Sequence, residues 1–122
     1  MEQLKERDGL TGLYRYDVFL EKLQKVLLMP RDYQICLVSS DIRHFRYINE
    51  HYGVSVGDRL LRSFAEALVE NGSNLLFACR VFSDNLVAAV RMPNGFDERR
   101  ICGIVKHFND EFSEAVRRKF FN

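Results

Sequence analysis

Residues 75–90, LLFACRVFSDNLVAAV, decide the fold of this chain. Two apolar runs, residues 75–81 and 86–90, lie on either side of the link Phe82-Ser83-Asp84-Asn85. Ser, Asp and Asn favour turns because their short side chains hydrogen-bond nearby backbone groups. The stretch therefore predicts a β-hairpin with a carboxylate, Asp84, at its tip. That carboxylate either closes the turn or binds a metal ion.

Length and composition indicate one globular domain. The chain has 122 residues, of which 47% are hydrophobic and 29% charged. The formal net charge is +1, so a general attraction to nucleic acid or to an anionic membrane is not expected. No apolar run approaches the ~20 residues that span a bilayer. The charged start of the chain lacks the apolar segment of a signal peptide, and a cytoplasmic location is expected.

The three cysteines are Cys36, Cys79 and Cys102. They are odd in number, far apart and set in apolar surroundings. This pattern predicts buried, reduced thiols rather than a disulfide or a zinc site.

Periodicity places the other elements around the hairpin. Residues 1–9 are a charged lead-in, and a turn-rich segment, DGLTGL, occupies residues 8–13. Apolar residues at helical spacing predict a helix that ends before Pro30, a second capped by Ser55, and a third capped by Asp97. The short, nearly continuous apolar run at residues 34–40 predicts a buried strand. The expected order is helix, strand, helix, strand, strand, helix.

Strand direction is expected to bring two carboxylates together. A helical crossover joins the strand at residues 34–40 to the first hairpin strand, which makes these strands parallel and the connection right-handed. Asp41 follows the first of them and Asp84 the second, so both should lie at the same end of the sheet. One or two carboxylates, completed by substrate phosphates, are the ligands that Mg²⁺ prefers.

Three segments resemble, in order and spacing, the motifs of the GGDEF family of diguanylate cyclases. DGLTGL at residues 8–13 is similar to D-x-L-T-G-L. SDIRHFRYINEHYG at residues 40–53, closed by Gly57-Asp58, resembles D-x-D-x-F-K-x-I-N-D-x-x-G...G-D. RVFSDNL at residues 80–86 takes the place of R-x-G-G-D-E-F. The resemblance covers essentially the whole chain and implies an α+β fold, a ferredoxin-like, nucleotide-cyclase-like central sheet with packed helices.

The resemblance also implies a chemistry and residue roles. The family condenses two GTP molecules into cyclic di-GMP, one per subunit of a head-to-head dimer, and uses Mg²⁺ to activate a ribose hydroxyl. Carried over by position, the metal would be held by two carboxylates and one backbone group: Asp41, Asp84 and Ile42. Asn49 and Asp58 would hydrogen-bond guanine, and Phe45 and Leu61 would line the nucleotide pocket.

Four positions depart from the family pattern: Phe82, Ser83, Asn85 and Arg43. Glycine at the first two lets the backbone approach a nucleotide, and Phe82 is expected to fill or reshape that space. Asn85 replaces a glutamate and can neither supply charge nor act as a base. Arg43 replaces the second acid of D-x-D and weakens a divalent site by repulsion. No catalytic residue is therefore expected.

The carboxyl end of the chain is a further departure. The family continues with another strand and with a helix whose Lys and Arg contact GTP phosphates. The expectation is a truncated domain, either a piece of a longer chain or a natural form, with an open sheet edge. SNLL at residues 73–76 stands where the family has its product-binding R-x-x-D, so no inhibitory site of that type is expected.

One principal hypothesis and two alternatives follow. Residues 1–122 form a degenerate, catalytically inactive GGDEF domain that acts as a regulatory or dimerisation module in bacterial cyclic di-GMP signalling. The alternatives are an allosteric domain that binds GTP without turnover and a cyclase with residual activity. Mg²⁺ would be bound weakly or not at all. The expected partners are GTP, a second copy of the chain or adjacent signalling domains, with neither nucleic acid nor membrane.

Overall fold

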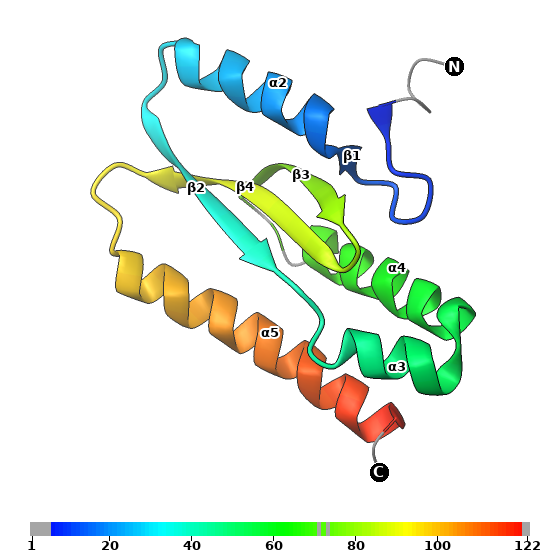
Figure 1. The fold of residues 1–122 in the computed structure, drawn as a ribbon. Coiled ribbons are helices and arrows are strands. Elements are labelled where there is room, and N and C mark those ends of the chain that lie inside the picture. The colour runs from blue at the N-terminus through cyan, green and yellow to red at the C-terminus, as the bar shows by residue number, and fades with distance from the viewer. Residues whose placement is uncertain (1–5, 71, 73, 121–122) are drawn as a thin grey trace.

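A four-stranded sheet with helices on both faces forms the domain (Figure 1). The computed structural model describes residues 6–70, 72 and 74–120. In chain order the elements are β1 (Tyr14–Arg15), α2 (Tyr16–Leu28), β2 (Tyr33–Ser40), α3 (Phe45–Tyr52), α4 (Val54–Glu70), β3 (Leu75–Phe82), β4 (Asn85–Pro93) and α5 (Glu98–Phe120). α2 covers one face of the sheet, and α3, α4 and α5 lie on the other. The expected α+β class is confirmed.

The strand order is β1-β3-β4-β2. The hairpin is confirmed, because β3 and β4 pair antiparallel. β2 also pairs antiparallel with β4, from Tyr33 opposite Pro93 to Ser40 opposite Leu86. β2 and β3 therefore run in the same direction, as the crossover predicted, although β4 lies between them. β1, which was not predicted, is two residues long and pairs parallel with β3.

Two apolar clusters pack on opposite faces of the sheet. On the α2 face, Phe19 and Cys79 are 1% and 0% exposed. The larger cluster, on the other face, joins the hairpin to α3, α4 and α5 and includes Leu61 and Ala78. Ala78 and Cys79 are neighbours in β3 and enter different clusters, as the two-residue period of a strand requires. The hairpin is therefore buried from both sides.

The first and last helices agree with the sequence pattern. α2 ends at Leu28, before Pro30, as predicted. Asp97 caps α5, because its Oδ1 accepts a hydrogen bond from the N–H group of Arg99 at 3.0 Å.

The region between β2 and β3 differs from the prediction. Ser55 was expected to cap a helix, but α4 already begins at Val54 and Ser55 lies inside it. The preceding residues form a separate helix, α3. Gly53 lies between the two helices with φ +95°, a conformation that glycine adopts without strain.

The cysteines differ in exposure. All three are free thiols, as predicted, but Cys102 is exposed, Cys36 is half-buried and only Cys79 is buried. The prediction of burial is therefore wrong for Cys102. Burial raises the pKa of the Cys79 thiol to about 11.

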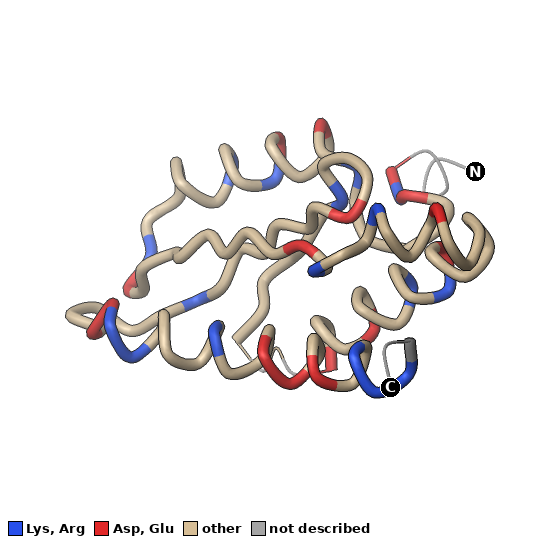
Figure 2. Tube along the Cα trace, turned by 60° about the horizontal axis from the view of Figure 1, so that its bottom comes forward, with Lys and Arg blue, Asp and Glu red and all other residues tan. Residues whose placement is uncertain are grey.

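Charged side chains of both signs lie along the helices. Figure 2 shows acidic residues in the middle of α5 and basic residues at its carboxyl end, where they complement the helix dipole. In the described ranges, no helix is both long and apolar enough to cross a membrane.

Candidate functional site

The loop after β2 and the tip of the hairpin meet at one end of the sheet. Asp41 directly follows β2. The backbone N–H group of the next residue, Ile42, donates a hydrogen bond to Oδ2 of Asp84 at 2.8 Å. The convergence of the Asp41 and Asp84 segments, which strand direction predicted, is confirmed.

The expected metal ligands provide a small set of oxygens. Asp41 is exposed, and its carboxylate has no hydrogen-bond or ion-pair partner among the described residues. One oxygen of Asp84 accepts the Ile42 N–H group, and the Ile42 carbonyl accepts the N–H group of Phe45 at 3.2 Å. Within the part of the chain that the structure describes, no three His, Cys, Asp or Glu side chains are grouped as metal ligands would be. The metal roles of Asp41, Ile42 and Asp84 remain predictions.

The tip of the hairpin keeps its turn despite the loss of both glycines. Ser83 has φ +50°, a left-handed conformation that favours glycine. Phe82 is 69% exposed, so its ring lies outside the packed interior. Asn85 Nδ2 donates to Ser39 Oγ at 2.9 Å and to the Ser40 carbonyl at 3.4 Å. The side chain at the family's glutamate position is therefore held against β2.

An ion pair that was not predicted ties the first motif to the hairpin. Arg80 Nη1 lies 3.3 Å from Asp8 Oδ1, and Arg80 Nε donates to the Ser83 carbonyl at 2.8 Å. The backbone N–H and the hydroxyl of Thr11 both donate to Asp8 Oδ2 at 2.8 Å. Partial burial alone would raise the pKa of Asp8, but the Thr11 hydrogen bonds and the Arg80 charge outweigh it and lower that pKa.

An open cleft of about 590 Å³ lies beside this ion pair, where β1 and α2 face the hairpin tip. Its walls include Asp8 and Arg80 together with Tyr16 and the exposed Phe82. Phe82 thus contributes to a surface shared with α2. The only sequence signal for this arrangement is that Asp8 and Arg80 belong to the first and third motifs.

The pair expected to bind guanine lies where α3 meets α4. Asn49 is half-buried, and its Oδ1 has no hydrogen-bond partner among the described residues. A Cβ atom on Gly57 would lie 1.7 Å from that oxygen. Glycine is therefore needed at position 57 because the Asn49 carboxamide occupies the space of a side chain. Asp58, the next residue, is half-buried.

The two apolar residues expected to line the nucleotide pocket belong to the core. Leu61 is 0% exposed and Phe45 is 9% exposed, and both pack in the larger apolar cluster. Their burial explains why these positions are apolar without reference to a ligand. Their contact with a nucleotide remains a prediction.

Arg43 faces α5. With His44, it lines a cavity of about 480 Å³ whose other wall is the acidic face of α5, including Asp110 and Glu114. A hydrogen bond from Lys106 and, to a smaller extent, the charge of Arg43 lower the pKa of Asp110. Arg43 therefore has acidic neighbours on α5, besides its proximity in sequence to Asp41.

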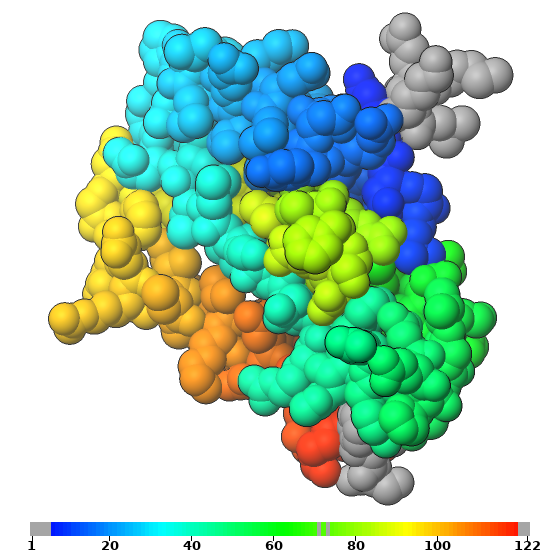
Figure 3. Space-filling view, in the orientation of Figure 1, coloured from blue at the N-terminus to red at the C-terminus, as the bar shows by residue number. Residues whose placement is uncertain are grey.

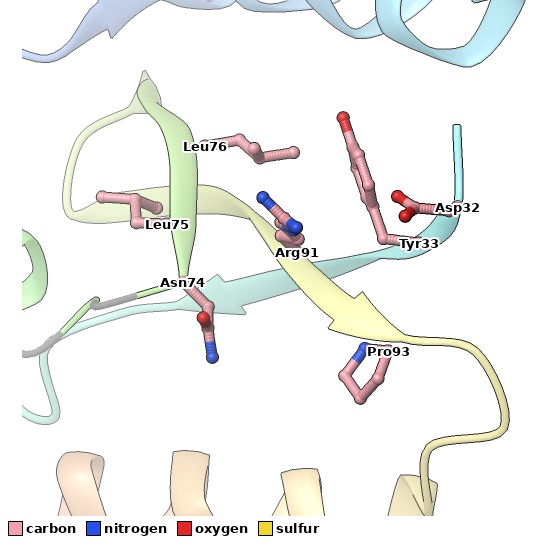
Figure 4. Close-up of a pocket in the computed structure, with 7 residues that line it drawn as sticks. All are labelled: Asp32, Tyr33, Asn74, Leu75, Leu76, Arg91 and Pro93. Atoms are coloured by element: carbon pink, nitrogen blue, oxygen red, sulfur yellow. The ribbon is translucent and has the colours of Figure 1, made fainter. Parts of the chain in front are cut away.

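A further cavity, of about 440 Å³, lies at the opposite end of the sheet (Figure 4). There the guanidinium group of Arg91 lies 4.8 Å from the centre of the Tyr33 ring. Because β2 runs from Tyr33 to Ser40, this cavity is separated from the Asp41–Asp84 end by the length of the strand.

Comparisons with known proteins identify the family. The family model described as "Diguanylate cyclase, GGDEF domain" matches residues 5–121, and the chain belongs to this family. YhcK of Bacillus subtilis, described as uncharacterized, is 32% identical over 90 residues, which are 71% of this chain and 24% of YhcK. PdeB, a cyclic di-GMP phosphodiesterase of Shewanella oneidensis, is 35% identical over 69 residues, which are 54% of this chain and 8% of PdeB. The chain thus spans a quarter or less of these relatives.

Solved structures agree with the fold. The coiled coil and GGDEF domain of DgcB from Caulobacter crescentus, in complex with c-di-GMP, superposes with a TM-score of 0.70 at 22% identity. The match covers 91% of this chain and 56% of the DgcB chain. The expected nucleotide-cyclase-like fold is confirmed.

Proposed function

We propose that this domain does not synthesise cyclic di-GMP and acts as a regulatory or dimerisation module in a bacterial cyclic di-GMP signalling protein. The hairpin tip is the observation that carries the proposal. Phe82 places an exposed aromatic ring where the family pattern has no side chain, and Asn85 directs its amide onto β2. Asp84 is the one carboxylate left at the tip.

The chemistry explains why these changes matter. Phosphoryl transfer needs a metal ion, a positioned nucleophile and positive charge around the phosphates. The tip supplies one carboxylate fewer than the family pattern. In addition, Arg43 lies two residues from Asp41, where its charge opposes a divalent cation. Binding to another domain or to a second copy needs none of these groups.

Product formation tests the proposal directly. The purified chain is incubated with GTP and Mg²⁺, and cyclic di-GMP is quantified by mass spectrometry. No product is expected, while an active diguanylate cyclase assayed in parallel provides the positive control. Cyclic di-GMP made by the wild-type chain would refute the proposal, and residual cyclase activity would then be the correct function.

GTP binding without turnover is a second candidate function. Asn49 supports it, because a buried carboxamide oxygen without a partner calls for an explanation beyond folding. If GTP carries Mg²⁺ to the domain, three groups would hold the ion: the Asp41 carboxylate, the free oxygen of Asp84 and the Ile42 carbonyl. Such a sparse protein set suits Mg²⁺, which keeps water and phosphate ligands. The bound ion would neutralise phosphate charge.

Calorimetry separates this candidate from the first. Titration of the chain with GTP and Mg²⁺ should release heat that Asp58→Ala abolishes and that Glu21→Ala, an exposed change on α2, preserves. Absence of heat with the wild-type chain rejects GTP binding and leaves the regulatory proposal in place. GTP is a cytoplasmic nucleotide, so a domain that binds GTP would lie in the cytoplasm.

The triple change Phe82→Gly, Ser83→Gly and Asn85→Glu restores the family residues at the hairpin tip. It tests whether the departures at the tip alone prevent GTP binding. If the tip alone prevents binding, this variant should bind GTP in the presence of Mg²⁺ and lose that binding in the presence of a chelator. A variant that folds but binds no GTP would show that the defect extends beyond the hairpin.

A further inference from the structure

Two aromatic rings and an ion pair lie together on an exposed surface beside the tip of the hairpin. They line the open cleft between α2 and the tip, and we call them the tip–α2 surface: Arg15, Tyr16, Asp17 and Phe82. Phe82 is 69% exposed and Tyr16 is 45% exposed. Figure 3 shows the hairpin tip at the surface, directly below the first turns of α2. Two segments far apart in the sequence therefore share one accessible surface.

The tip–α2 surface lies on the β1 side of the sheet. β1 directly precedes α2 and pairs with β3, whereas β2 is the strand at the other edge. A further strand beside β2, such as the family carries, would be separated from β1 by β3, β4 and β2. The exposure of the tip–α2 surface therefore does not depend on such a strand.

Charges of both signs are balanced on this surface. Arg15 Nη2 lies 3.2 Å from Asp17 Oδ2, and these side chains are 53% and 65% exposed. An ion pair as exposed as this one contributes little to the stability of a fold, so its members can exchange partners at little cost. Deeper in the cleft, Arg80 is paired with Asp8. A strongly acidic or strongly basic partner would therefore leave charges of one sign unpaired.

The two rings have no role in the core. Neither Phe82 nor Tyr16 belongs to the two apolar clusters formed by the described residues. Large aromatic side chains and arginine are enriched at protein interfaces, where a few central anchors carry most of the binding energy. Folding alone therefore does not explain a phenylalanine at position 82 and a tyrosine at position 16, whereas contact with another protein surface does.

We propose that the tip–α2 surface binds the same surface of a second copy of the chain about a two-fold axis. Phe82 of each copy packs on Tyr16 of the other, and Arg15 of each copy pairs with Asp17 of the other. A two-fold contact must be self-complementary, and a surface with two rings and one charge of each sign meets that condition. The contact rests on the dimerisation part of the proposed function and gives it a defined surface. Unlike the family's head-to-head dimer, which forms with one GTP per subunit, this contact needs no nucleotide.

Sedimentation of the purified chain tests the contact. The wild type should dimerise as its concentration rises, to the same extent with GTP and Mg²⁺ as with a chelator. Phe82→Ser should weaken dimerisation by about tenfold or more, because it removes a central ring. Leu28→Lys, at the 79% exposed end of α2, is the control and should leave dimerisation unchanged. A wild-type chain that stays monomeric at all concentrations, or that dimerises only with GTP, overturns the proposal, while the absence of cyclic di-GMP synthesis would stand.

Two charge reversals distinguish this surface from any other. Arg15→Asp sets two aspartates opposite each other in the contact, and Asp17→Arg sets two arginines opposite each other. Each variant alone should therefore stay monomeric at concentrations where the wild type dimerises. In an equimolar mixture, aspartate meets arginine at both positions, and a heterodimer should form.

Recovery on mixing requires contact between chains, because each variant has lost the ion pair within its own chain. Circular dichroism of each variant confirms that it is folded before mixing. Dimerisation of either variant alone at the strength of the wild type, or the absence of a heterodimer in the mixture, would overturn the proposal.

Discussion

The backbone N–H group of Ile42 and the carboxylate of Asp84 join two loops through a hydrogen bond of 2.8 Å. A hydrogen bond to an ionised acceptor is stronger than one between neutral groups. It fixes the hairpin tip against the loop that begins at Asp41. Asp84 therefore has a structural role, whether or not a metal ion also uses its second oxygen.

Asp84→Ala should lower the free energy of unfolding by about 1–2 kcal/mol, because the Ile42 N–H group loses its acceptor. Urea denaturation monitored by circular dichroism measures the change. Asp84→Asn, which keeps an acceptor oxygen but no charge, should cost less. Glu21→Ala, an exposed carboxylate on α2, is the control and should be close to neutral. Equal stabilities for Asp84→Ala and Glu21→Ala would contradict the assigned role.

The meeting of these loops could be predicted because it depends on strand direction alone. The apolar runs located β2 and the hairpin, and a crossover connection makes β2 and β3 run the same way. The ion pair between Asp8 and Arg80 could not be predicted in this way. It requires β1 beside β3, and a strand of two residues has no periodicity to detect.

The site between α3 and α4 shows a second limit of sequence patterns. The sequence pattern predicts a single helix here, capped by Ser55, whereas Gly53 separates two helices, α3 and α4. The approach of Gly57 to Asn49 follows from how those helices meet, and not from the spacing of either residue. The family motif marked both positions without giving the physical reason for the glycine.

Gly57→Ala should destabilise the domain by about 1–3 kcal/mol, because the new methyl group meets Asn49 Oδ1 and the helices must shift. Gly103→Ala is a matched control inside α5, where an added Cβ meets no atom within 4 Å. The control should be stabilising by about 0.5–1 kcal/mol, since alanine favours helix over glycine. Two changes of the same sign would contradict the packing described for Gly57.

A double-mutant cycle identifies the cause of that loss. Asn49→Ala removes the carboxamide that Gly57 accommodates, so Asn49→Ala with Gly57→Ala should cost less than the sum of the two single changes. A coupling energy of about 0.5–3 kcal/mol is expected for residues in contact. Additive effects in thermal or urea unfolding would mean that the methyl group at position 57 meets something other than Asn49.

Ser83→Gly should stabilise the hairpin by about 1 kcal/mol, because a left-handed conformation costs other residues about 1–2 kcal/mol. Ser83→Val should have the opposite effect, as β-branched residues tolerate positive φ poorly. Urea unfolding of both variants gives the comparison. If Ser83→Gly is destabilising, the hydroxyl group stabilises the turn more than the positive φ strains it.

Asp8 should make the stability of the domain sensitive to acid. Hydrogen bonds from Thr11 and the charge of Arg80 lower its pKa in the folded state below the ordinary value of 3.8. A carboxyl group whose folded pKa is depressed stabilises the fold above the unfolded pKa, and this contribution is lost as pH falls through the folded pKa. Urea unfolding of the wild type and of Asp8→Asn should therefore differ by a constant amount from pH 5 to pH 7. The difference should shrink progressively below about pH 4.

Arg80→Met should weaken the pH dependence, whereas Glu21→Gln should leave it unchanged. Parallel stability curves for the wild type and Asp8→Asn throughout the acid range would show that the ion pair between the first motif and the hairpin does not stabilise the fold.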